Sequence, residues 1–154
     1  MTFGFVKPLN SIVVDDNSGG RKPLIQGLKV EVAANMYPGR LVIKGTNDDD
    51  AVVSGASGLI TGWLGYEQAD PNFQPVDVDT LYAANDTAPV LYGSGFVLVA
   101  SLAATQTIVK GDRLSAGALG QVVKTVSPAV IVGVAMETVT TTGSAADIMV
   151  LSLI

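Results

Sequence analysis

Short apolar and β-branched runs, bounded by turn-forming polar residues, recur along most of this chain, and some of them alternate apolar and polar side chains. Residues 28–32, Leu-Lys-Val-Glu-Val, are the clearest example, and a period of two is the signature of a half-buried β-strand. No window carries the sustained apolar spacing of an amphipathic helix, although Ala83-Ala84 and Ala103-Ala104 could form single helical turns. Further strands are predicted at residues 40–44, 51–54, 59–66, 81–82, 90–92, 96–100, 107–109, 112–115, 120–124, 129–136 and 147–154.

Turn-forming residues separate these runs at close spacing. Pro38-Gly39 predicts a turn, and Gly93-Ser94-Gly95 predicts a hairpin turn into the next strand. Glycines inside predicted strands, Gly62, Gly65 and Gly133, are typical of β-bulges or of close approach by another backbone. About ten short strands with such turns predict an all-β fold, either a single β-sandwich or a barrel-like domain of the jelly-roll or β-tulip kind.

Residues 1–26 differ from the rest of the chain. Residues 1–10 are apolar without a clear period, and residues 15–20 are a cluster of turn formers. One interpretation is an edge strand at Ser11–Val14 followed by a loop. The other is an extended arm whose apolar side chains dock on a neighbouring subunit. We therefore expect an extended N-terminal arm over residues 1–26 and one all-β body over residues 27–154, with no internal repeat.

The composition is low in charge. Hydrophobic residues make up 48% of the 154 residues and charged residues only 15%, against about 25% charged in a typical soluble domain. Such a deficit indicates that other chains cover part of the surface, as in an oligomer or a lattice. The longest apolar run, residues 129–136, is far below the roughly 18–20 residues of a membrane helix, so no membrane contact is expected. Lys7 and Pro8 interrupt the apolar start where a signal peptide would continue.

Charge and residue types also narrow the function. The net charge is −5 with no basic run, which argues against nucleic-acid binding. The absence of cysteine removes disulfides and thiolate chemistry, and the absence of histidine removes the commonest general base and metal ligand. Catalysis by Lys, Glu or Asp remains open. We expect no enzyme activity, no catalytic residue, no metal site and no cofactor.

Two acidic segments are candidates for chemistry. Asn47 to Asp50 could bind Ca²⁺ or Mg²⁺ through oxygen ligands, but the segment lacks the EF-hand pattern, and a solvated hairpin loop is favoured. Asp77 and Asp79 would lie on one side of an extended segment, where such a pair could act as acid and base or hold a metal. No other residue supplies a suitable partner, and the flanking prolines favour an ordinary connection.

Aromatic and apolar residues are candidates for an interface. Trp63 and Tyr66 are three positions apart, so on one strand they would lie on opposite faces, one in the core and the other toward a partner or solvent. Tyr82 and Tyr92 could be core or interface, and core packing is favoured. The predicted interface residues are Phe3, Phe5, Val6, Ile12, Val14, Trp63 and Tyr66.

An ordered series of motifs in the second half of the chain resembles a known family. The series runs through residues 79–86, 90–92, the glycine turn at 93–95, and residues 96–104, 108–114, 120–122, 131–137 and 147–151. Its order and spacing resemble the small capsid decoration, or cement, proteins of tailed phages and related viruses. The resemblance covers roughly residues 27–154, and most clearly 79–151. In its Gly-Asp-x-Leu motif, Gly111 permits a positive φ and Asp112 can accept local backbone N–H bonds.

This resemblance implies a structural role. Such proteins sit on the outer surface of an assembled capsid, often as homotrimers, bind the major capsid protein across capsomer boundaries, and catalyse nothing. A permanent, apolar interface would suit the low charge of this chain. Two alternatives remain open. One is another virion component, such as a minor shell, tail or fibre-base protein. The other is a carbohydrate-binding β-sandwich or a β-clip enzyme domain.

Overall fold

A computed structural model describes residues 11–14, 21–127 and 129–154. This part of the chain is built almost entirely from strands, and its one helical element is a single 3-10 turn, η1. None of its helical segments is long or apolar enough to cross a membrane. The elements are β1 (Leu24–Val30), β2 (Leu41–Lys44), β3 (Asp50–Val53), β4 (Ile60–Leu64), β5 (Thr87–Tyr92), β6 (Val97–Leu102), β7 (Thr107–Ile108), β8 (Arg113–Ala116), η1 (Ala118–Gly120), β9 (Val122–Lys124), β10 (Ile131–Ala135), β11 (Val139–Thr140) and β12 (Ala146–Ser152).

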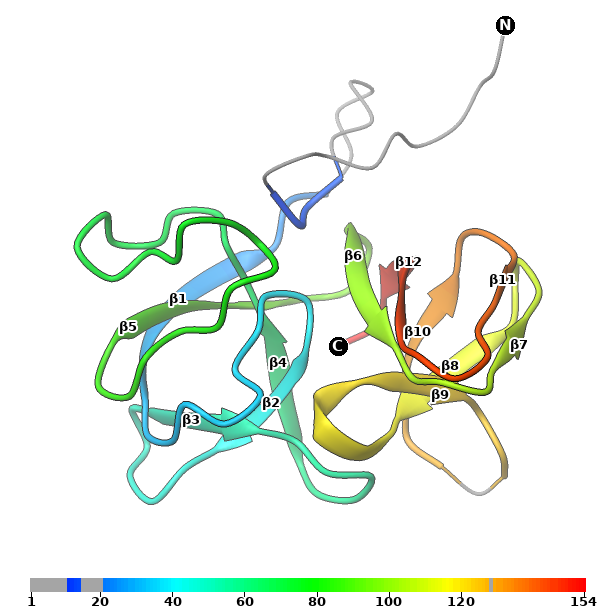
Figure 1. Ribbon diagram of the computed structural model, residues 1–154, viewed down its shortest axis with the longest axis horizontal. Helices are drawn as coiled ribbons and strands as arrows, with labels where there is room; N and C mark the ends of the chain where they lie inside the picture. The colour runs from blue at the N-terminus through cyan, green and yellow to red at the C-terminus, as the bar shows by residue number, and fades with distance from the viewer. Residues whose placement is uncertain (1–10, 15–20, 128) are drawn as a thin grey trace, which may run out of the picture.

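The strands close into two barrels, which lie side by side (Figure 1). The first barrel has the order β1-β3-β2-β4-β5, and the second has the order β10-β12-β6-β9-β8. A separate two-stranded ribbon pairs β7 with β11. The C-terminus lies between the two barrels. The all-β, barrel-like prediction is therefore confirmed, with the strands divided between two barrels rather than collected in one.

Side chains alternate between buried and more exposed positions in both barrels, as predicted for the first from its sequence, whereas residues 96–100 of the second are all apolar. In β1, Leu28 and Val30 are buried, whereas Lys29 between them is exposed. In β6, Leu98, Ala100 and Leu102 point inward. Leu98 and Ala100 lie opposite buried residues of β12 in an antiparallel register. Each barrel thus encloses the apolar half of its alternating strands, and this burial is the main source of its stability.

One buried cluster joins the two barrels. It contains Leu41, Trp63 and Leu91 of the first barrel together with Phe96 and Leu98 of the second. Trp63 is fully buried, and its indole Nε1 donates a hydrogen bond to the Ser152 hydroxyl of β12 at 3.0 Å. A smaller cluster, centred on β1, β2 and Tyr82, lies inside the first barrel alone. The barrels therefore pack on each other through a shared core.

The Gly93-Ser94-Gly95 turn carries the chain from one barrel to the other. β5 pairs with β1 and β4, whereas β6 pairs with β12 and β9. The prediction of a hairpin turn was wrong, because these consecutive strands belong to different sheets. Both glycines have positive φ, 108° at Gly93 and 100° at Gly95, a conformation that glycine adopts without steric cost. The sharp turn was predicted, but the strands with which β5 and β6 pair were not.

Glycines inside strands mark irregular pairing, as expected. The β10–β8 register shifts between Ile131 and Gly133, and a Cβ on Gly133 would lie 2.9 Å from the carbonyl oxygen of Leu151. The β2–β4 register shifts beside Gly62, where a Cβ would lie 2.6 Å from the carbonyl oxygen of Leu91. The close-approach interpretation is confirmed at both positions. Gly65 lies just beyond the end of β4.

A few predicted elements differ from the structure. Residues 81–82 form no strand, because the Tyr82 N–H donates to the carbonyl of Met36 and its hydroxyl to that of Gly65, inside a loop. The two Ala-Ala pairs form no helical turn, whereas η1 and β11 were not predicted. The division into an arm and a body stays a prediction. Leu24–Gln26, at the end of the expected arm, lie in β1.

Candidate functional site

The segment Ser11–Val14 lies along the free edge of β6. β9 pairs with β6 only at Leu102, which leaves the earlier part of that edge open. There the N–H of Val99 donates to the carbonyl of Ile12 at 2.7 Å, and the N–H of Val14 donates to the carbonyl of Val97 at 2.9 Å. This antiparallel pairing agrees with the edge-strand interpretation of the segment, and it covers backbone groups that an edge would otherwise expose.

Glu67 holds this segment from the other barrel. The side chain follows β4 of the first barrel, and its Oε1 accepts hydrogen bonds from the N–H groups of Ile12, at 2.6 Å, and Val13, at 2.8 Å. The hydroxyl of Ser11 donates to the same oxygen. The segment is therefore tied to both barrels at once. No local sequence pattern singles out Glu67, because its partners lie more than fifty positions away along the chain.

A groove of about 590 Å³ lies beside this segment. Its apolar wall continues onto the outer face of the second barrel, where Val97 pairs with Leu151 and Val99 with Met149. Val97 and Met149 are buried there, in a cluster with Val14, and Val99 and Leu151 are partly buried against it. This face is therefore suited to apolar side chains rather than to polar chemistry. Polar groups reach the groove from Arg21, Lys22, Glu67 and Gln68; the apolar lining is Val13, Val14, Pro23, Leu24, Ile25, Phe96, Val97, Met136 and Leu151.

The predicted interface residues fall into two groups. Ile12, Val14, Trp63 and Tyr66 are all buried within the chain itself. Ile12, Trp63 and Tyr66 belong to the cluster shared by the barrels, and Val14 packs with Val97 and Met149. Their own chain therefore covers them. The remaining three, Phe3, Phe5 and Val6, lie outside the described residues, and their role stays a prediction.

The expectation that Trp63 and Tyr66 face opposite sides was wrong. β4 ends at Leu64, so strand alternation does not extend to Tyr66. The chain turns inward there, and the Tyr66 hydroxyl donates to the carbonyl of Pro75 at 2.8 Å. Tyr82 is fully buried, which agrees with the favoured interpretation of core packing. This burial raises the pKa of its hydroxyl. Tyr92 is half-buried, with its hydroxyl 3.2 Å from Oε1 of Gln26.

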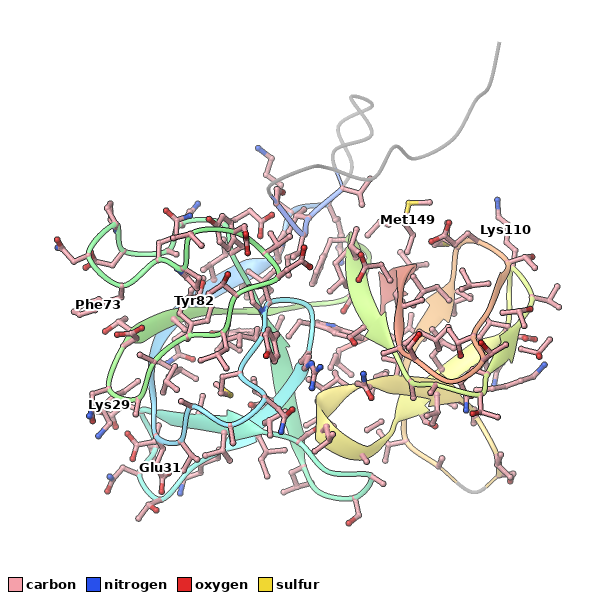
Figure 2. All side chains as sticks on the ribbon, viewed as in Figure 1. Lys29, Glu31, Phe73, Tyr82, Lys110 and Met149 are labelled. Carbon is pink, nitrogen blue, oxygen red and sulfur yellow. The ribbon has the colours of Figure 1, made fainter. Side chains whose placement is uncertain are left out.

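The acidic segment at residues 47–50 closes the turn between β2 and β3. Asp50 is buried, with Lys29 Nζ 3.1 Å from its Oδ1 and the Asn47 side-chain amide 2.8 Å from its Oδ2. The hydrogen bond from the Asn47 side chain is the main cause that lowers the pKa of Asp50, and the hydrogen bond from Lys29 is the next. Asp48, in contrast, is exposed. Figure 2 shows Lys29 at this corner of the first barrel, near Glu31.

Asp77 and Asp79 lie in a turn rather than in the expected extended segment. Oδ1 of Asp77 accepts hydrogen bonds from the N–H of Asp79, at 3.0 Å, and from the hydroxyl of Thr80, at 2.7 Å. This is the local arrangement by which aspartate stabilises turns. The carboxylate of Asp77 therefore serves the conformation of the loop between β4 and β5.

The Gly111–Leu114 motif has the predicted geometry. Gly111 has a φ of 95°, and Oδ2 of Asp112 accepts the N–H of Val109 at 2.9 Å. Lys124 Nζ lies 2.8 Å from the same oxygen. The interaction with Lys124 is the main cause that lowers the pKa of Asp112, and the hydrogen bond from the Val109 N–H lowers it further. Across residues 11–14, 21–127 and 129–154, no three His, Cys, Asp or Glu side chains gather where they could hold a metal ion.

Replacing Glu67 with alanine is expected to loosen Ser11–Val14 from β6. The change removes the oxygen that accepts from three donors of this segment, and hydrogen bonds to charged groups contribute about 1.5–3 kcal/mol, an amount that solvent reduces at a partly exposed site such as this one. Amide hydrogen exchange at Val14 and Val99 should therefore become about ten times faster or more, while exchange at Val150 inside the β6–β12 pair stays unchanged. Glu67→Gln, which keeps an acceptor oxygen, should have a smaller effect. Equal protection of Val14 in all three proteins would contradict this anchoring role.

Comparisons with known proteins add one finding on the fold. No family model and no curated protein matches the sequence. Among solved structures, the chain is similar to the crystal structure of the head fiber gp8.5 N base in bacteriophage phi29. The TM-score is 0.51 at 16% sequence identity, and the match covers 85% of this chain and 94% of that one. At this identity the likeness concerns the fold.

Proposed function

We propose that this chain is a structural protein of a phage virion, bound to the outer surface of the head. The finer form of the proposal is a decoration protein that contacts the major capsid protein, stabilises the shell across capsomer boundaries and acts as a homotrimer. The observation that carries the proposal is the likeness of the fold to the phi29 head fiber base, which extends over 94% of that chain. The ordered motifs of residues 79–151 support the same class of protein.

The roles of the polar side chains support a structural function. Glu67 anchors an edge strand, Asp50 and Asp112 are each engaged by a lysine and a backbone or amide donor, and Asp77 stabilises a turn. These carboxylates are used in holding loops and strands together. An apolar groove and a set of exposed apolar loops supply surface for partners, as expected for a subunit of a permanent assembly.

One alternative within the virion is favoured by a specific observation. The similar structure is described as the base of a head fiber, so this chain could be the module that attaches a fibre to the head. Both forms of the proposal place the chain on the head. They differ in whether a longer projection is attached to it.

Electron microscopy of the virus that encodes this chain tests the proposal. Gold-conjugated antibodies against the purified protein should label the heads of intact particles. Heads assembled without the protein should release their genome at a lower temperature, and adding the purified protein should restore the original release temperature. Label at the base of head projections would favour the fibre-base form. Label confined to tails, or absent from intact particles, would overturn the proposal.

A further inference from the structure

The two barrels repeat one pattern of strand pairing. In the first, β1 pairs in parallel with β3 and antiparallel with β5, β2 pairs with β3 and β4, and β4 pairs with β5. In the second, β6 pairs in parallel with β9 and antiparallel with β12, β8 pairs with β9 and β10, and β10 pairs with β12. The strands β1 to β5 therefore correspond in order to β6, β8, β9, β10 and β12 (Figure 1). The barrels are two copies of one fold within the chain.

Two glycines fix this correspondence residue by residue. Gly62 in β4 and Gly133 in β10 each lie where the strand register shifts. A Cβ on either would meet the carbonyl oxygen of a leucine on the next strand, Leu91 at 2.6 Å or Leu151 at 2.9 Å. The expectation of no internal repeat was therefore wrong for the fold. The sequence hides the repeat because equivalent positions carry unlike side chains: the residue after the glycine is tryptophan in β4 and valine in β10.

The same correspondence matches the early parts of β1 and β6. Through the pairs that the two leucines make, Ile25 corresponds to Val97, and Gly27 corresponds to Val99. On β6, the carbonyl of Val97 and the N–H of Val99 are the two groups that hold the segment Ser11–Val14. The equivalent groups on β1 are the carbonyl of Ile25 and the N–H of Gly27.

These two groups of β1 lie on an open edge. The N–H of Lys29 donates to the carbonyl of Asp49 at 2.8 Å, on the side of β1 that faces β3. Because N–H groups two residues apart on a strand point the same way, the N–H of Gly27 points to that side as well. The pairing of β3 with β1 is confined to Lys29 and Val30. Within the described part of the chain, no hydrogen bond reaches the N–H of Gly27 or the carbonyl of Ile25.

Space for side chains adjoins this edge. Gly27 is exposed. A pocket of about 430 Å³ is lined by Ile25 and Gly27 of β1, by Thr87 and Pro89 of β5, and by residues 68–71. The groove of about 590 Å³ beside Ser11–Val14 also reaches Ile25. An added strand would therefore find backbone partners and room for its side chains, the two requirements of β-augmentation.

Residues 2–6 have the composition of such a strand. They contain threonine, two phenylalanines and valine, which are all strand formers. Pro8 ends the stretch that can pair, because proline has no N–H. Lys7 is the only charged side chain among residues 1–10, whereas residues 67–86, which include part of the pocket lining, carry five acidic residues and no basic one. Opposite charges favour the approach of this segment to the loop.

The N-terminal segment begins on the side of its strand away from β1. Ser11, to which residues 1–10 connect, lines a pocket beside Arg40. Val14, at the other end of the strand, lines the groove that reaches Ile25. This arrangement favours docking of residues 2–6 on another copy over folding back onto β1 of the same chain.

We propose that the open edge of β1 binds residues 2–6 of a second copy as an added strand. The carbonyl of Ile25 and the N–H of Gly27 hold this strand, as their equivalents on β6 hold Ser11–Val14. The three predicted interface residues of the segment then pack beside β1. The inference names a contact for the homotrimer in the proposed function and rests on it in that respect. Its test uses the free protein, whereas the proposed function is tested on virus particles.

Gly27→Pro and Phe5→Asp test the two sides of this contact. Proline removes the N–H of Gly27 and is tolerated on an edge strand where that N–H faces outward. Light scattering with gel filtration should show an oligomer for the wild type and a monomer for each variant. Gly27→Ala is the matched control and should stay oligomeric, because it keeps the N–H and its Cβ would meet only a methyl group of Thr87, at 3.2 Å. Circular dichroism and thermal unfolding should show that all three variants remain folded.

Mixing the two monomeric variants shows whether the contact joins different copies. Gly27→Pro keeps an intact N-terminal segment and Phe5→Asp keeps an intact edge, so an equimolar mixture should form a complex that neither variant forms alone. No complex in the mixture, an oligomer that persists in either variant, or a monomeric wild type would overturn the inference and leave the proposed virion role intact. Variants that remain oligomeric but no longer bind heads would assign the edge to the shell instead of to a second copy. Failure of the wild type to label heads would bear on the proposed function alone.

Discussion

Replacing Trp63 with alanine should lower the free energy of unfolding by about 3–5 kcal/mol, the usual cost of removing a buried aromatic side chain. Trp63 is fully buried, and it contacts the core of both barrels in one cluster. The substitution opens a cavity where the barrels meet, and it removes the hydrogen bond to the Ser152 hydroxyl. Urea unfolding followed by far-ultraviolet circular dichroism measures the loss. Fluorescence is unsuitable, because Trp63 is the only tryptophan.

Two variants serve as controls for this prediction. Trp63→Phe retains an aromatic ring in the shared core, so its loss of stability should be clearly smaller than that of the alanine variant. Leu59→Ala changes a side chain that is 89% exposed, and its effect should stay within about 0.5 kcal/mol. If Trp63→Ala unfolds at the same urea concentration as the wild type, the barrels do not depend on this side chain for their packing.

Replacing Gly120 with alanine should cost about 2–5 kcal/mol. The residue has a φ of 71°, and a left-handed conformation costs a non-glycine residue about 1–2 kcal/mol. A Cβ at this position would also lie 2.6 Å from Cγ2 of Val53 and 2.7 Å from the carbonyl oxygen of Leu41, both in the first barrel. Overpacking of this kind adds about 1–3 kcal/mol. Urea unfolding again measures the loss.

Gly111→Ala isolates the contact between the barrels. Gly111 has a φ of 95°, and no atom lies within 4 Å of the position of its Cβ. Alanine there should cost only the backbone strain, about 1–2 kcal/mol. The difference between the two variants reports how closely η1 packs on the first barrel. Equal losses in the free energy of unfolding for Gly120→Ala and Gly111→Ala would mean that the first barrel accommodates the added methyl group without cost.

Short apolar and β-branched runs bounded by turn formers identified most strands, because this signal depends only on neighbouring residues. In the predicted strand 28–32, Leu28 and Val30 are buried, whereas Val32 lies beyond the end of β1 and is 51% exposed. The irregular pairing at Gly62 and Gly133 was also predictable, because a glycine inside a strand usually marks a bulge or a close backbone approach. The choice of pairing partners was not predictable. Gly93-Ser94-Gly95 looks the same whether the strands on either side of it pair with each other or enter different barrels.

The roles of the acidic residues depended on distant partners. Asp48 and Asp50 are two positions apart in one loop sequence, yet one is exposed and the other is buried against Lys29. Glu67 carried no local signal, although it binds three groups of residues 11–13. Trp63 and Tyr66 were assigned to opposite faces because the end of β4 was placed two residues too late.

The amino-acid sequence by itself determined the all-β class, most strand positions, the turn at Gly111 and the low surface charge. These follow from side-chain period, from glycine conformation and from composition, all of which are local or additive. Only the tertiary structure decided the division into two barrels, the shared core around Trp63 and the anchoring of residues 11–14 by Glu67. Each of these depends on which distant segments pair, and pairing is set by the free energy of the whole packed chain.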